Sequence, residues 1–232
     1  GMNLTVTVET APGVWWTFNL AKVVPSSLTG TWKLDGAGAA GVGPTAGSME
    51  WFTTDADVVA ARACWFDDSF VFGLDGSFSN EMGTDTWVEA WQGGTDSCGA
   101  PVAPHDGTAA GTWVWDEAAG TLTINGKGAH LGLPKAVNGQ ELATPSAAPD
   151  SITYNILTLT ADGMNLTVTV ETAPGVWWTF NLAKNSSVVA DPVVADPVVE
   201  DLGTGDNNVL NVSEVINFNS TTVGVYALAD FG

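Results

Sequence analysis

Cations are scarce in this chain. Six Lys and Arg residues stand against 26 Asp and Glu residues in 232 positions, a formal net charge of −20. A surface this acidic repels phosphate groups, so neither nucleic acid nor an anionic membrane surface is an expected partner. No apolar run approaches the ~20 residues that a membrane-spanning helix needs, so membrane insertion is not expected either. The charge favours solubility and attracts divalent cations.

Cysteine and histidine are almost absent. The chain has two cysteines, Cys64 and Cys98, and two histidines, His105 and His130, and their spacing does not fit a zinc site. One disulfide closing a loop of roughly 35 residues is the simplest use of the cysteines, worth about 3–4 kcal/mol by loop-closure entropy. Two buried free thiols are the alternative. A disulfide would indicate an oxidising, extracytoplasmic setting and therefore a secreted or cell-surface protein.

Helical periodicity is nearly absent too, and only residues 53–63 could form a short helix. Elsewhere apolar and polar residues alternate in short stretches that turn residues separate. These stretches are 28–34, 69–78, 86–92, 111–128 and 151–160. The pattern predicts an all-β fold, an antiparallel meander that forms a lipocalin-like barrel or a β-sandwich.

One segment occurs twice without a change: GMNLTVTVETAPGVWWTFNLAK is both 1–22 and 163–184. Its alternation around an Ala-Pro-Gly turn predicts a β-hairpin with one apolar face, and a lone hairpin is marginally stable in water. We therefore expect 163–184 to close a complete domain, 23–184. Residues 1–22 would be the terminal hairpin of a preceding identical repeat, so that the domain is one unit of a tandem array. A hairpin that swaps into a neighbouring sheet is the alternative.

The composition changes after Lys184. Residues 185–208 are acidic, contain proline and lack cations, which predicts a semi-rigid linker. Residues 209–232 are expected to start a further β-sandwich module that stops in mid-strand.

The strings PVAPHDG (101–107) and GAHLGLPKAVNG (128–139) stand in a block, 23–184, that resembles a repeat module of large secreted proteins of marine bacteria. Such modules occur in adhesin-like arrays and behind the catalytic domains of laminarinase-type glycoside hydrolases. The resemblance implies secretion and a non-catalytic role. The layout also resembles lipocalin-like barrels, in its Gly-x-Trp first strand, its DGSF turn and its closing Trp-Phe-x-Leu strand. Residues 216–232 resemble the opening of β-sandwich modules.

The first candidate site is the stretch TWVEAWQ, 86–92. As a strand it would place Trp87, Glu89 and Trp91 on one face, where two indoles could stack on a sugar ring while the carboxylate and Gln92 bind hydroxyl groups. In the alternative, both Trp residues belong to the core and Glu89 pairs with Arg62.

Two further candidates lie in loops and on the last hairpin. The long loop 92–107, held by Cys98, could present His105 and Asp106 as a polar pair. No serine or cysteine nucleophile accompanies them, so a turn in which Asp106 accepts backbone hydrogen bonds is favoured over catalysis. Trp177, whose copy is Trp15, lies on the polar side of its hairpin. There it could bind a ligand, and its repetition would add multivalency, or it could meet the next domain.

Asp67 and Asp68 could join backbone carbonyls in a calcium site, and a salt bridge to Arg62 is the alternative. No other cofactor is expected. No convergent acid–base pair indicates an enzyme. We therefore expect a non-catalytic extracellular repeat module that acts in adhesion or filament assembly, with weak multivalent glycan binding. Its partners would be neighbouring repeats or subunits of the same protein and a glycan surface. The alternatives are a carbohydrate-binding module on a polysaccharide-degrading enzyme and a lipocalin-like binder of small ligands.

Overall fold

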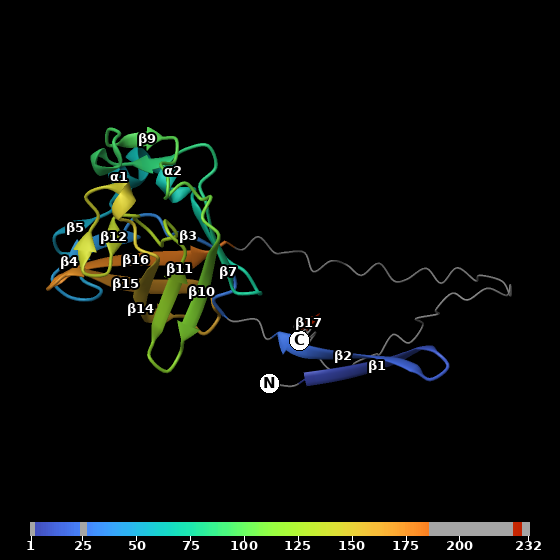
Figure 1. Cartoon of the computed structure of the whole chain (residues 1–232). Helices are drawn as coiled ribbons and strands as arrows, with labels where there is room; N and C mark the ends of the chain where they lie inside the picture. Colours follow the sequence, from blue (N-terminus) through green and yellow to red (C-terminus); the bar gives the residue numbers. More distant parts are fainter. Residues whose placement is uncertain (1–2, 24–26, 186–224, 229–232) are drawn as a thin grey trace, which may run out of the picture. The chain divides into compact units, whose positions relative to one another are not determined.

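The computed structural model describes residues 3–23, 27–185 and 225–228. The chain forms two units, one of Gly1–Val24 with Ser186–Gly232 and one of Pro25–Asn185 (Figure 1).

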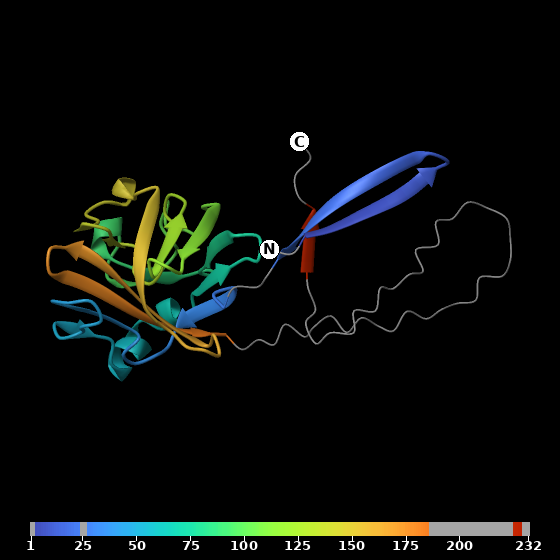
Figure 2. The same ribbon diagram turned by 90° about the horizontal axis from the view of Figure 1, so that it is seen from below.

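The larger unit is a closed antiparallel barrel. Its strands are β3 (Gly30–Leu34), β6 (Ser69–Phe72), β7 (Ser77–Glu81), β10 (Gly111–Asp116), β11 (Thr121–Asn125), β14 (Ser151–Leu159), β15 (Asn165–Ala173) and β16 (Val176–Lys184). Each strand pairs with the next in this order, and β16 pairs with β3 to close the barrel. The predicted all-β meander is confirmed in its barrel form. In Figure 2 the long β15–β16 hairpin (orange) forms one wall.

Three insertions interrupt the meander. The first, 35–68, holds β4 (Ala40–Gly43), β5 (Phe52–Thr53), α1 (Ala56–Ala61) and α2 (Ala63–Phe66). The second, 82–110, holds β8 (Thr86–Val88), a 3₁₀ helix (Ala90–Gln92) and β9 (Ser97–Gly99). The third, 126–150, holds β12 (Ala136–Val137), β13 (Gln140–Glu141) and a second 3₁₀ helix (Pro145–Ala147).

All three insertions leave the same end of the barrel. They follow β3, β7 and β11, and these strands run in the same direction because the direction alternates from each strand to the next. Figure 1 shows α1, α2 and β9 together at this end, which we call the insertion end. The helix expected in 53–63 is confirmed as α1. Its N-cap is Asp55, whose Oδ1 accepts a hydrogen bond from the Val58 N–H at 2.9 Å.

Large apolar side chains fill the barrel. The inward positions of the strands carry Trp32, Phe70, Phe72, Phe78, Leu122, Ile124, Tyr154 and Phe180, all buried. Polar atoms among them are paired, since Trp32 Nε1 donates to Leu28 O at 2.7 Å and Leu131 N donates to the Tyr154 hydroxyl at 2.9 Å. The interior is therefore a packed core, as in small barrels whose side chains meet at the axis.

The predicted disulfide is confirmed. Cys64 of α2 and Cys98 of β9 are bonded, with their Cα atoms 5.9 Å apart. The bond links the first insertion to the second across a sequence separation of 34 residues.

The smaller unit is a three-stranded antiparallel sheet in the order β1 (Asn3–Ala11), β2 (Val14–Val23) and β17 (Val225–Leu228). The expected first hairpin is therefore present. Most of the predicted linker, 185–208, and most of 209–232 lie outside the described residues.

Candidate functional site

Residues 86–92 do not form one strand, which corrects the expectation of a single Trp87–Glu89–Trp91 face. Strand β8 ends at Val88, and a 3₁₀ helix spans Ala90–Gln92. Gln92 ends the strand, because its side-chain Oε1 accepts a hydrogen bond from the Glu89 N–H at 3.0 Å. A side chain that binds nearby backbone in this way competes with the ladder bonds of a strand.

Glu89 is fully engaged within the barrel unit. Its Oε2 accepts a hydrogen bond from Trp91 Nε1 at 3.0 Å, and its Oε1 lies 3.1 Å from Lys135 Nζ. Lys135 also lies 3.9 Å from Glu141 Oε2 and above the ring of Trp178. The partner of Glu89 is thus Lys135 and not Arg62, and the pair links the second insertion to the third.

Trp87 is covered on one ring face. The Arg62 guanidinium carbon lies 4.4 Å from the centroid of a Trp87 ring and 5.8 Å from that of Phe52. The Trp87 Nε1 is buried and makes no hydrogen bond among the described residues. Arg62 is therefore engaged with aromatic rings, and within the same residues it forms no ion pair with Asp67 or Asp68.

His105 lies inside the insertion end rather than on its surface. It is 3% exposed and packs edge-on against Trp91 and His130, with ring centroids 5.6 and 5.8 Å away. Burial lowers the pKa of His105 to about 4 and that of His130 to about 3, so both imidazoles are neutral at pH 7. Asp106, the neighbour of His105, accepts two hydrogen bonds at Oδ1, one from Thr108 Oγ1 at 2.6 Å and one from Thr108 N at 3.1 Å. The expected turn is therefore confirmed.

Asp68 is 4% exposed, whereas Asp67 is exposed. The Thr86 hydroxyl donates to Asp68 Oδ2 at 2.6 Å, and Oδ1 is buried without a partner among the described residues. Burial raises the pKa of Asp68 to about 7.

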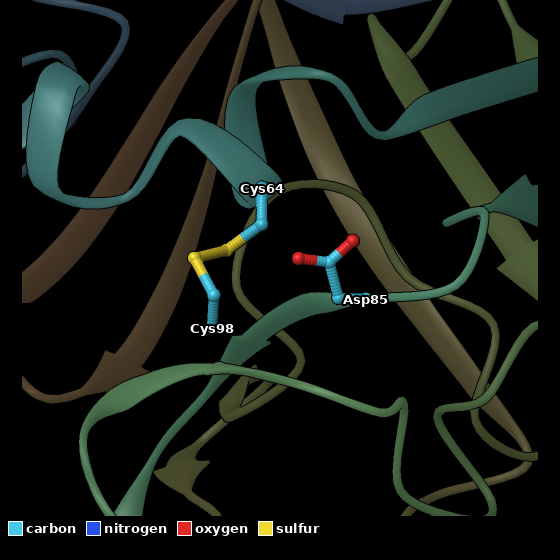
Figure 3. Close-up of side chains that lie close together, drawn as sticks. All are labelled: Cys64, Asp85 and Cys98. Carbon is cyan, nitrogen blue, oxygen red and sulfur yellow. A yellow bond between two sulfur atoms is a disulfide. The ribbon is translucent and has the colours of Figure 1, made fainter.

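Neither aspartate belongs to a cluster of potential metal ligands in the described residues. The group found there is Cys64, Asp85 and Cys98, whose ligand atoms lie within 4.8 Å of one another. Figure 3 shows the Asp85 carboxylate beside the Cys64–Cys98 disulfide. A disulfide supplies no thiolate, and thiolate is the form in which cysteine binds metals, so only the Asp85 carboxylate is left as a ligand.

Trp177 lies in a groove on the outside of the barrel, where β15 turns into β16. The groove has a volume of about 390 Å³. Its lining residues are Asn138, Gly139, Thr153, Asn155, Glu171, Ala173, Pro174 and Trp177. Trp177 stands directly opposite Glu171 in the hairpin, so the strand pairing itself places a carboxylate beside an indole.

The third insertion builds the other wall of this groove. Strands β14 and β15 pair only from Asn155 opposite Thr169 onward, and the turn at 138–139 fills the gap beyond that pair. The Asn138 side chain forms two hydrogen bonds of 2.8 Å with the backbone of Thr153, and Gly139 N donates to Glu171 O at 2.8 Å. The turn is thereby fixed between the two strands.

Several polar groups of the groove remain available. Glu171 Oε1 accepts a hydrogen bond from Gly175 N at 3.0 Å. Its other oxygen, the Asn155 amide and the Trp177 indole N–H form no hydrogen bond among the described residues. A partly exposed aromatic ring beside a free carboxylate oxygen and a free amide can bind a sugar, whose C–H groups pack on the ring while its hydroxyl groups form hydrogen bonds with the polar atoms.

The first hairpin repeats half of this arrangement. Gly13 N donates to Glu9 Oε1 at 2.8 Å, as Gly175 N does to Glu171, and Trp15 faces Glu9 across the strands. Trp15 is 58% exposed, whereas Trp177 is half-buried. Within the described part of the chain, the first hairpin therefore has the aromatic ring and the carboxylate without the walls.

Two other grooves have no aromatic residue in their lining. One, of about 290 Å³, is lined in part by Val88, Gln92 and Val102, but Gln92 Oε1 is bonded to Glu89 N. In the other, of about 210 Å³, the side chains of Thr167 and Asn181 bond to each other at 2.8 Å. Of these three grooves, the one at Trp177 is thus the groove that combines an aromatic ring with free polar groups.

No family model matches this sequence, and a search of curated proteins finds no match. Among the described residues, no helix is long and apolar enough to cross a membrane.

The sequence named Trp177 as a candidate and did not point to the polar groups beside it. Glu171 could have been found, since it faces Trp177 across a hairpin whose turn was located correctly. Asn138 is 17 residues away from Asn155 along the chain and carries no local signal. Their proximity depends on a turn that enters between two strands.

Proposed function

We propose that the barrel is a non-catalytic module of an extracellular repeat protein and binds neutral polysaccharide at the Trp177 groove. The observation that carries this proposal is the set of free polar groups around one partly exposed indole: a Glu171 oxygen, the Asn155 amide and the Trp177 N–H. The confirmed disulfide supports an oxidising compartment. The duplicated hairpin supports a repeat protein that works in adhesion or surface assembly.

The charge of the chain selects among glycans. With a net charge of −20, the protein repels uronic acid and sulfate groups, and the carboxylate in the groove adds to that repulsion. Neutral hexose polymers have no such penalty. We therefore name neutral polysaccharide as the ligand class.

A groove of about 390 Å³ with one aromatic ring accommodates only a short segment of polymer. Binding by one module is expected to be weak, with a Kd on the order of 1 mM, which corresponds to about 4 kcal/mol. Attachment would then depend on many modules binding one polymer at the same time, so that the avidity exceeds the affinity of each site.

Affinity electrophoresis of the full chain tests the proposal. The gels contain a soluble β-glucan, α-glucan or mannan, and alginate serves as the anionic contrast. Trp177→Ala should abolish the retardation that the unsubstituted chain shows in a neutral polymer. Glu171→Gln and Asn155→Ala should each weaken it, and alginate should retard none of these proteins.

Trp15→Ala is the matched control, since it removes the same side chain from the copy that has no groove walls among residues 3–23, 27–185 and 225–228. It should migrate like the unsubstituted chain. Full retardation of Trp177→Ala, or no retardation of any variant by the neutral polymers, would contradict the proposal.

A further inference from the structure

The first hairpin has the internal pairing of the hairpin that closes the barrel. Leu4 lies opposite Leu20 as Leu166 lies opposite Leu182, and both hairpins change register between the Glu and Ala that precede the turn. Identical sequence and identical register give the two hairpins the same backbone donors and acceptors along both outer edges. Any strand that fits the edge of one also fits the other.

The edge of β2 already carries a strand in the barrel register. Leu228, Ala227 and Tyr226 of β17 lie opposite Leu20, Ala21 and Lys22. Leu34, Lys33 and Trp32 of β3 lie opposite the equivalent residues Leu182, Ala183 and Lys184 of β16. The sequences agree as well, since Gly-Val-Tyr-Ala-Leu (224–228) matches Gly-Thr-Trp-Lys-Leu (30–34) at glycine, aromatic residue and leucine. The first hairpin therefore accepts the kind of strand that the barrel supplies.

The barrel also buries what the first hairpin exposes. Trp16 is 56% exposed, whereas its counterpart Trp178 is 5% exposed and donates from Nε1 to Glu141 Oε1 at 2.6 Å. Transfer of the first hairpin into the position of the second would bury Trp16 and expose Trp178 in exchange, so the burial of Trp16 is a net gain once residues 165–184 have left the barrel.

The chain is long enough for this transfer within one molecule. In the barrel, Lys184 lies opposite Trp32. If Lys22 took that position, residues 23–31 would connect two neighbouring antiparallel strands. Such strands lie about 5 Å apart, and a nine-residue loop spans that distance without strain.

We propose that residues 3–23 are a second closing hairpin, which can occupy the position of residues 165–184 in the barrel of the same chain. Residues 27–160 then form a barrel body with two alternative closures, one joined through β3 and the other through β14. This inference does not depend on the glycan site.

The present closure is held by its turn. The Thr160 hydroxyl donates to Asp162 Oδ1 at 2.5 Å, Met164 N donates to the same oxygen at 3.0 Å, and Asn165 N donates to Thr160 Oγ1 at 2.9 Å. The two hairpins are equal in sequence, so this turn and the shorter connection favour residues 165–184. Loss of that segment leaves the position to residues 3–23.

Segment replacement in the full chain tests the proposal. One variant carries a Gly/Ser segment of equal length in place of 165–184, a second carries it in place of 3–23, and a third carries both. Hydrogen exchange of the β3 amides reports whether a strand covers that edge of the barrel, and light scattering gives the mass. The matched pair Val168→Pro and Val6→Pro repeats the comparison with single substitutions at equivalent positions.

Each single replacement should keep β3 amides exchanging roughly 100-fold more slowly than the double replacement does, at monomer mass. Val168→Pro alone should likewise keep a folded barrel. If replacement of 165–184 removes protection as completely as the double replacement, the proposal is wrong. Protection accompanied by dimer mass would also overturn it, because the hairpin would then come from a second copy.

Discussion

Asp68→Asn should stabilise the protein more at pH 8 than at pH 4. Asp68 is 4% exposed, and burial raises its pKa from 3.8 to about 7. Between these two values the folded state holds a proton that the unfolded state has released, so this group's contribution to stability decreases as pH rises. The asparagine variant has no proton to lose and escapes that decrease.

The size of this stability effect follows from the change in the pKa of Asp68 on folding. About three pKa units at 1.36 kcal/mol each correspond to a difference of roughly 4 kcal/mol, fully developed above pH 7. The free energy of unfolding, measured by urea denaturation at pH 4 and pH 8, gives this difference as a change in the effect of the substitution.

Asp67→Asn is the control, because Asp67 is next to Asp68 in the sequence and its side chain is exposed. It should change stability by a similar small amount at both pH values. An effect of Asp68→Asn that is the same at pH 4 and pH 8 would refute the argument that the carboxyl is protonated in the folded protein.

Two more predictions concern the insertion end. His105 and His130 have pKa values of about 4 and about 3 in the folded state, so the unfolded state binds more protons below pH 6.5. Their contribution to stability should decrease as pH falls from 6.5 towards 4, by roughly 3 kcal/mol for His105 alone. In His105→Gln, the free energy of unfolding measured by denaturation should therefore decrease less over this pH range. The double variant Cys64→Ser, Cys98→Ser should lose about 3–4 kcal/mol of unfolding free energy, seen as a lower urea midpoint, and an unchanged midpoint would remove the disulfide from the account of stability.

The barrel could be predicted because its strands alternate regularly. Trp32 and Leu34 lie two residues apart and share the inner face, and the same period of two recurs in the strands that follow. The closing hairpin stood out through its exact copy at 1–22. The sequence left barrel and sandwich equally open, because the choice depends on whether β16 meets β3, a pairing between residues about 150 positions apart.

The candidate site was predicted less well, and the reason is local chemistry that periodicity does not register. TWVEAWQ alternates like a strand, but the Gln92 side chain binds Glu89 N and turns the chain into a 3₁₀ helix. His105 looked like a loop residue available to a ligand, yet a second imidazole, His130, comes from another insertion to cover it. Contacts between insertions decide which side chains remain free.

Titration of the full chain with a neutral oligosaccharide, followed by NMR of the tryptophan indole N–H groups, would show directly whether the Trp177 groove binds a glycan. We expect the Trp177 indole signal to shift with ligand concentration while that of Trp15 stays in place. The backbone amides of Asn155 and Glu171 should shift along with Trp177. Shifts centred instead on Trp87 and Trp91, or no shift with any neutral sugar, would contradict this expectation.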